Sequence, residues 1–298
     1  MTDFNEYEKK PALPVWARIT LIIIAYTIFT GLFQILAMLL AGIPLHLPDG
    51  KGIINIQQQA FLSGFGLIPL AIIIYTFRRF LDRKSISTIG FSIKNRISDL
   101  GAGFIIALIF MVGGSLILYA TNEIGLSSIP FKVSGIIFSF ILFVFVALNE
   151  EILFRGYILN NLLDSTNKYV ALLISALIFS MLHSLNPNFS FIAFINILLA
   201  GIILGSTYIF TRNLWFPISL HLFWNFFQGP VMGYSVSGMK IESIFKVNLT
   251  GSELINGGQF GFEGSLVCTL LLIPAIALIL IYYIKFHNKK ADLVPVQL

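Results

Sequence analysis

Charged residues are scarce in this 298-residue chain, and their scarcity indicates its class. Only 11% of the residues are charged, 57% are hydrophobic, and the mean hydropathy is +0.88, whereas a soluble domain carries about 25% charged residues. The apolar residues form near-continuous blocks of about 20, not alternating segments of about ten. This pattern favours membrane-spanning helices over an outer-membrane barrel.

Cysteine and several protease signatures are also lacking. Cys268 is the only cysteine, which excludes an internal disulfide, a cysteine-cluster metal site and paired-thiol redox chemistry. The H-E-x-x-H zinc helix, a pair of spanning-helix aspartates and the G-x-S-x-G serine elbow are missing. No basic helix with interleaved aromatic residues supports nucleic-acid binding.

Eight apolar blocks predict an all-α polytopic membrane protein with about eight spanning helices. The blocks cover about residues 18–43, 58–77, 100–121, 133–160, 168–185, 190–210, 213–230 and 265–285. Lys and Arg between the blocks divide 15 to 4 between the two sides, which by the positive-inside tendency places both termini and the loop 78–99 in the cytoplasm. We expect one transmembrane domain, 1–298. We interpret residues 231–264 as a flexible outer loop, because this stretch is rich in glycine. We interpret residues 265–298 as the last helix and a cytoplasmic tail.

Ionisable residues inside the blocks are few, and each is a candidate for function because a charge is costly in a bilayer. In the fourth block, Glu151 and Arg155 are four residues apart and share a helix face, so Arg155 can neutralise Glu151. Glu150 lies about 100° around the helix and is the freer carboxylate, available as a base. The competing interpretation is a structural ion pair with a spare carboxylate.

Two histidines and an asparagine accompany these carboxylates. If the fourth and fifth blocks form a hairpin around residue 165, Glu150 and His183 lie at one level, each about 20 Å from the turn. In the seventh block, His221 and Asn225 share a helix face, where the amide of Asn225 suits fixing a histidine tautomer or holding an oxyanion. The structural alternatives are that His183 is a packing residue and that His221 and Asn225 form hydrogen bonds between helices.

The order Glu-Glu-x-x-x-Arg, Phe-x-x-x-His, His-x-x-x-Asn closely resembles the CAAX protease and bacteriocin-processing family (CPBP, or Abi) of intramembrane endopeptidases. The resemblance covers roughly residues 85–230, which would form the catalytic core. It implies that Glu150 is the catalytic glutamate, that Glu151 supports it together with Arg155, and that His183, His221 and Asn225 complete the site.

Two hydrolytic mechanisms stay open. Either Glu150 activates water directly, with His183 polarising it and His221 and Asn225 holding the oxyanion, or the two histidines and Glu150 bind zinc and leave a fourth position for water. We expect a multi-pass enzyme of the plasma membrane, of bacterial type, that cleaves membrane-associated peptides or protein tails. The alternatives are a non-catalytic membrane scaffold or bacteriocin self-immunity protein, and a proton-coupled transporter.

Overall fold

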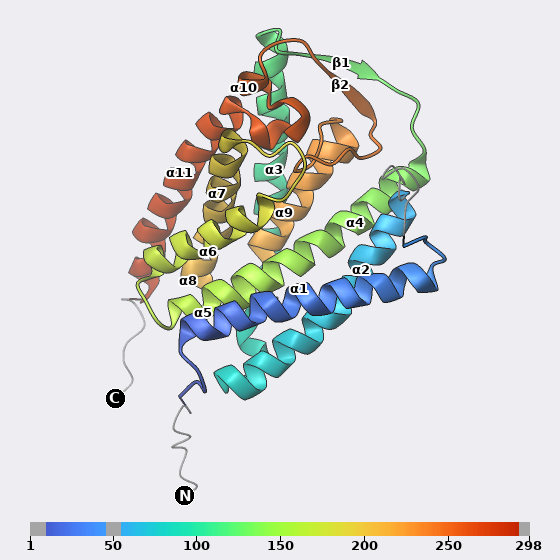
Figure 1. Ribbon diagram of the computed structural model, residues 1–298. Coiled ribbons are helices and arrows are strands. Elements are labelled where there is room, and N and C mark those ends of the chain that lie inside the picture. Colours follow the sequence, from blue (N-terminus) through green and yellow to red (C-terminus); the bar gives the residue numbers. More distant parts are fainter. Residues whose placement is uncertain (1–9, 46–54, 292–298) are drawn as a thin grey trace, which may run out of the picture.

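The chain is helical almost throughout (Figure 1). The computed structural model describes residues 10–45 and 55–291, the last five of them (287–291) as backbone only. The main helices are α1 (Val15–Leu40), α2 (Ile56–Thr76), α3 (Ile97–Ala120), α4 (Val133–Glu151), α6 (Lys168–His183), α7 (Phe191–Ser206), α9 (Trp215–Phe226) and α11 (Leu266–Ala291). Short helices are α5 (Asn160–Leu163), α8 (Tyr208–Thr211) and α10 (Glu253–Asn256), and the strands are β1 (Ile124–Ser128) and β2 (Phe245–Leu249).

The all-α polytopic class is confirmed, and every predicted apolar block corresponds to one main helix. Among the described residues, six helical segments are long and apolar enough to cross a membrane. They are Val15–Leu40, Ile56–Asp82, Ile97–Ala120, Val133–Leu163, Phe191–Thr211 and Leu266–Phe286. With 16 residues, α6 is about 24 Å long, short of the roughly 30 Å hydrocarbon core. The count of eight spans therefore stays a prediction.

Polar residues mark where several helices begin. The Asn55 side chain accepts a hydrogen bond from the backbone N–H of Gln58, whose own side chain accepts one from Asn55, so this capping box starts α2. Asn167 caps α6 and Ser190 caps α7 through backbone N–H groups of the first turn. The turn between Leu163 and Lys168 lies where the hairpin is predicted.

Three helices widen into π-helical turns: α2 into Phe77–Asp82, α4 into Ile152–Leu159 and α9 into Phe227–Val231. A π-turn adds a residue to the helical turn and often occurs at functional sites. The turn in α4 begins directly after Glu151 and packs against α6. The hydrophobic pattern did not predict it, because a single wide turn hardly disturbs the apolar period.

The segment 231–264, interpreted from its glycines as a flexible outer loop, is instead ordered. It contains β2 and α10, and it buries Tyr234, Phe260 and Phe262. Strand β2 pairs antiparallel with β1, Ile124 opposite Leu249, which ties the segment to the end of α3. The glycines permit tight turns: at Gly261 (φ +100°) the backbone carries a conformation that L side chains rarely adopt.

The first main helix begins and the last one ends at the same end of the bundle. In Figure 1 the start of α1 and the end of α11 lie near α5 and α8, and the β1–β2 sheet lies at the opposite end. Two of the basic residues in the 15-to-4 count, Arg18 and Arg78, are buried and share the carboxylate of Asp82. Asn161 of α5 donates to the same carboxylate, at 3.2 Å. This buried cluster holds α1, the end of α2 and α5 together.

Candidate active site

The two glutamates at the end of α4 occupy different environments. The side chain of Glu151 is fully buried, whereas that of Glu150 retains 26% exposure. Adjacent residues on a helix point about 100° apart, so the two carboxylates enter different spaces. The prediction that Glu150 is the freer carboxylate agrees with this geometry.

Glu151 anchors a buried ion cluster. Its Oε1 accepts a hydrogen bond from Nη1 of Arg155 at 2.7 Å, so the ion pair predicted from the four-residue spacing is present. The same oxygen accepts from Nδ1 of His221, also at 2.7 Å. Arg155 donates its other nitrogen to the carbonyl oxygen of Gly201 at 3.1 Å. Glu151 and Arg155 together thus join α4, α7 and α9.

Phe179 supports both this cluster and His183. The Arg155 guanidinium lies 4.7 Å from the centroid of the Phe179 ring, within cation–π range. The His183 ring lies 4.4 Å from that centroid, and the carbonyl oxygen of Phe179 is 2.7 Å from His183 Nδ1. Residues four apart on a helix are neighbours, so the Phe-x-x-x-His spacing places the phenylalanine where it can orient the imidazole.

Both histidines turn Nε2 toward Glu150. Nε2 of His183 lies 3.7 Å and Nε2 of His221 lies 3.8 Å from the same Glu150 oxygen, Oε2. The predicted common level of Glu150 and His183 is therefore observed. A carbonyl or carboxylate oxygen only accepts hydrogen bonds, so Nδ1 carries a proton in both rings. Oε2 of Glu150 is buried and has no hydrogen-bond partner among the described residues.

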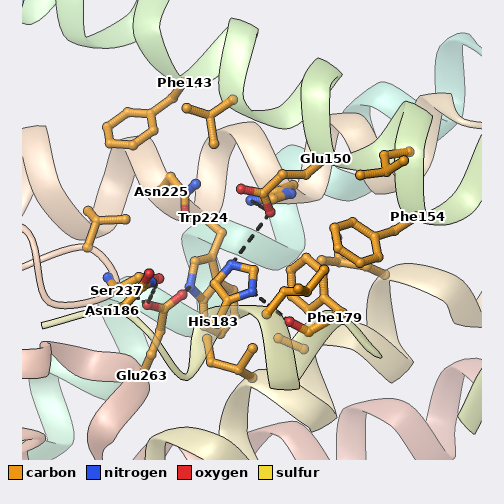
Figure 2. Close-up of a pocket in the computed structure, with 18 of the residues that line it drawn as sticks. Phe143, Glu150, Phe154, Phe179, His183, Asn186, Trp224, Asn225, Ser237 and Glu263 are labelled. Carbon is orange, nitrogen blue, oxygen red and sulfur yellow. Dashed lines mark hydrogen bonds and ion pairs between the residues drawn. The ribbon is translucent and has the colours of Figure 1, made fainter. Parts of the chain in front are cut away.

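These groups line a cavity of about 390 Å³ (Figure 2). Its walls come from α1, α2, α4, α6, α7 and α9 and from residues 236–241. The expected core 85–230 supplies every motif residue, and α1 and α2 add Tyr26 and Gln59 to the lining. Asn225 also lines the cavity; it is 5% exposed, and its side chain makes no hydrogen bond to another described residue.

Asn225 does not fix the tautomer of His221, because Glu151 does so. The other role considered for the Asn225 amide is to hold an oxyanion, which requires an N–H donor without an internal partner. An N–H group without an internal partner is available to a ligand that carries negative charge.

Glu263 is the cavity residue that the sequence motifs miss. It precedes α11, is 5% exposed and lines the cavity together with Glu150. No spacing rule connects it to the three motifs, because it lies 38 positions beyond Asn225 in a glycine-rich stretch. Three glutamates in that stretch were visible in the sequence, but the sequence did not show that Glu263 alone of them is buried.

The zinc site that the sequence left open as one of two mechanisms does not fit the side chains as they lie. Zinc holds N and O ligands at about 2.0–2.2 Å in a tetrahedron, so neighbouring ligand atoms are roughly 3.4 Å apart. Nε2 of His183 and of His221 are both farther than this from Glu150 Oε2. Within the described ranges, no group of three or more His, Cys, Asp or Glu side chains could hold a metal ion.

Comparison with known families agrees with the motifs. Residues 132–227 match the family model described as Type II CAAX prenyl endopeptidase Rce1-like. A comparison with curated proteins found no significant match. The matched region runs from the start of α4 to the end of α9 and contains Glu150, His183 and His221. The resemblance predicted from the motifs is confirmed.

Proposed function

We propose that this member of the CAAX protease family hydrolyses peptide bonds of membrane-associated peptides or protein tails, with Glu150 as the general base. The observation that carries the proposal is the convergence of His183 Nε2 and His221 Nε2 on one unpartnered oxygen of Glu150, inside a cavity within the helical bundle.

The spacing suits a water nucleophile. At 3.7 and 3.8 Å the two nitrogens are too far from Glu150 Oε2 for direct hydrogen bonds, but two groups that share one water molecule at about 2.8 Å each can be this far apart. A water in this position lies beside the Glu150 carboxylate, which can take its proton.

The reaction follows from these positions. Glu150 takes a proton from water, and the hydroxide adds to the carbonyl carbon of the scissile bond. The amide N–H of Asn225 donates to the oxyanion that forms. Glu150 then passes its proton to the leaving nitrogen as the C–N bond breaks. Glu151 and Arg155 act on this chemistry through His221, whose ring they hold in one tautomer.

The family description suggests the substrate. A Type II CAAX prenyl endopeptidase cleaves a tail that carries a prenyl group, and the mainly apolar lining of the cavity suits a lipidated or hydrophobic peptide. Leader-bearing peptides and signalling peptides meet the same condition. We further propose a position in the plasma membrane with both termini in the cytoplasm, which the 15-to-4 division of Lys and Arg supports.

Hydrolysis by purified protein in liposomes tests the proposal. The substrates are internally quenched hydrophobic peptides, one set farnesylated near the C-terminus and one set unmodified. We expect wild type to cleave at least one set, and Glu150→Gln to lose activity by about 10³-fold or more, because the general base is removed. Equal rates for the two proteins would refute the role of Glu150, and no cleavage of any peptide would favour a scaffold.

A further inference from the structure

A second carboxylate, Glu263, faces the cavity without a cationic partner. Among the described residues it forms no ion pair, and no lysine or arginine lines the cavity. Glu151, in contrast, is neutralised by Arg155 outside the cavity. A buried carboxylate is costly unless a cation or several hydrogen bonds compensate it.

Four donors hold the Glu263 side chain in place. Oε2 accepts from the backbone N–H of Ser237 at 3.0 Å, from the Ser237 hydroxyl at 2.9 Å and from Gln228 Nε2 at 3.3 Å. Oε1 accepts only from Trp224 Nε1, at 3.2 Å. Each carboxylate oxygen has two lone pairs, so Oε1 retains acceptor capacity. The carboxylate is thus fixed in position and incompletely satisfied.

The position of Glu263 separates it from the proposed chemistry. Figure 2 shows Glu263 beside Trp224 and Ser237, and in this view Glu150 lies on the other side of His183. Its donors come from α9, from the π-turn after α9 and from residue 237, not from the glutamate–histidine group. A group that binds substrate and does not react with it would occupy such a place.

We infer that Glu263 forms a subsite for a cationic side chain, lysine or arginine, of the peptide substrate. The inference rests on the proposed peptidase function and adds to it a preference for one basic residue close to the cleaved bond. A cationic side chain would neutralise Glu263 in a surrounding of low polarity, where a charge-assisted hydrogen bond is stronger than in water. The aliphatic stem of lysine or arginine would pack on the apolar lining.

Paired peptides test the inference. An internally quenched apolar peptide in liposomes carries lysine, norleucine or acetyl-lysine at one of four positions on each side of the cleaved bond. Norleucine keeps the four-carbon stem without the charge. At one of these positions, the kcat/KM of wild type for the lysine peptide should be about 10-fold higher than for either neutral peptide. One charged hydrogen bond provides a ratio of about this size.

Variants of the subsite assign the effect. Glu263→Gln should lose the lysine preference, so that its kcat/KM values for the lysine and norleucine peptides become about equal. Glu263→Asp, which keeps the charge on a shorter side chain, is the second variant and should retain a reduced preference. Ser237→Ala removes one donor and leaves the charge, so its preference should remain. Thermal unfolding of each protein is measured alongside.

The outcomes separate the two proposals. Cleavage of all peptides by wild type without a lysine preference overturns the inference and leaves the peptidase proposal intact. An equal fall for lysine and norleucine peptides in both Glu263 variants also overturns it, because Glu263 would then be structural. If wild type cleaves no peptide while remaining folded, the peptidase proposal fails and the inference fails with it.

Discussion

Replacing each glutamate of the pair by glutamine should separate stability from catalysis: Glu151→Gln should lower both, and Glu150→Gln should lower activity alone. Glu151→Gln keeps the shape of the side chain and can still accept from Arg155 and His221 through its remaining oxygen. It removes the negative charge, however, and leaves the Arg155 side chain, 1% exposed, without a counter-ion. Its new amide group would stand where Oε2 of Glu151 is buried without a partner.

The expected cost follows from burial. Removing one partner of a buried ion pair typically costs about 3–5 kcal/mol. The Arg155 contacts with Gly201 and Phe179 remain, so we expect the lower part of this range. For a chain of this size, a loss of about 3 kcal/mol lowers the unfolding midpoint by on the order of 10 °C.

Glu150→Gln should behave differently. Its carboxylate is 26% exposed, and Oε2 has no hydrogen-bond partner to lose among the described residues. We expect a change of about 1 kcal/mol or less in stability, with activity reduced by about 10³-fold or more. Thermal unfolding of the detergent-purified proteins, followed by tryptophan fluorescence, and peptide hydrolysis on the same preparations measure both quantities.

A double variant checks the electrostatic reasoning. Arg155→Met removes the cation with a side chain of similar length. Combined with Glu151→Gln, it should restore much of the lost stability, because a pair of uncharged side chains replaces a broken ion pair. Activity should not return, because His221 no longer donates to a carboxylate. Near-wild-type stability of Glu151→Gln together with unfolding of Glu150→Gln would show that the two roles are reversed.

Three further outcomes are expected. In intact cells, a membrane-impermeant maleimide should label Lys246→Cys and spare Lys94→Cys, both exposed positions, once the buried native cysteine is replaced; the reverse would overturn the topology. A Cβ on Gly201 would lie 2.9 Å from the α6 backbone, so Gly201→Val should separate α6 from α7 and abolish activity, whereas Gly113→Ala on α3, with open space around it, should be neutral. Elemental analysis should find full activity at well below one zinc per chain; about one zinc, lost in His183→Ala, would restore the metal mechanism.

The site was predictable from sequence to the extent that helical spacing determines it. Glu151 and Arg155, Phe179 and His183, and His221 and Asn225 are each four residues apart, and a helix makes such pairs neighbours whatever surrounds it. The level of His183 relative to Glu150 required one assumption, a hairpin near residue 165. The π-turn in α4 lies in this arm, between Glu150 and the hairpin, and was not part of the estimate.

Helical spacing could not predict contacts between segments that are far apart in the sequence. Glu151 and His221 are 70 residues apart, and the hydrogen bond between them replaces the role given to Asn225. Strand β1 meets β2 across more than a hundred residues, and neither strand has a strong alternating pattern. Such pairing depends on where α3 and α9 bring the chain.

Charge provides the argument that links the three glutamates to function. Glu151 is compensated by Arg155 and His221, so its burial is explained by structure alone. Glu150 and Glu263 line the cavity and lack a lysine or arginine partner among the described residues. Neutral side chains in their place would avoid the cost of taking a carboxylate out of water, so a mere scaffold gains nothing from two acidic groups on its cavity. Two such carboxylates on one cavity therefore indicate ligands that interact with them. At Glu150 these are a water molecule and the carbonyl group of the substrate, and at Glu263 a positively charged group.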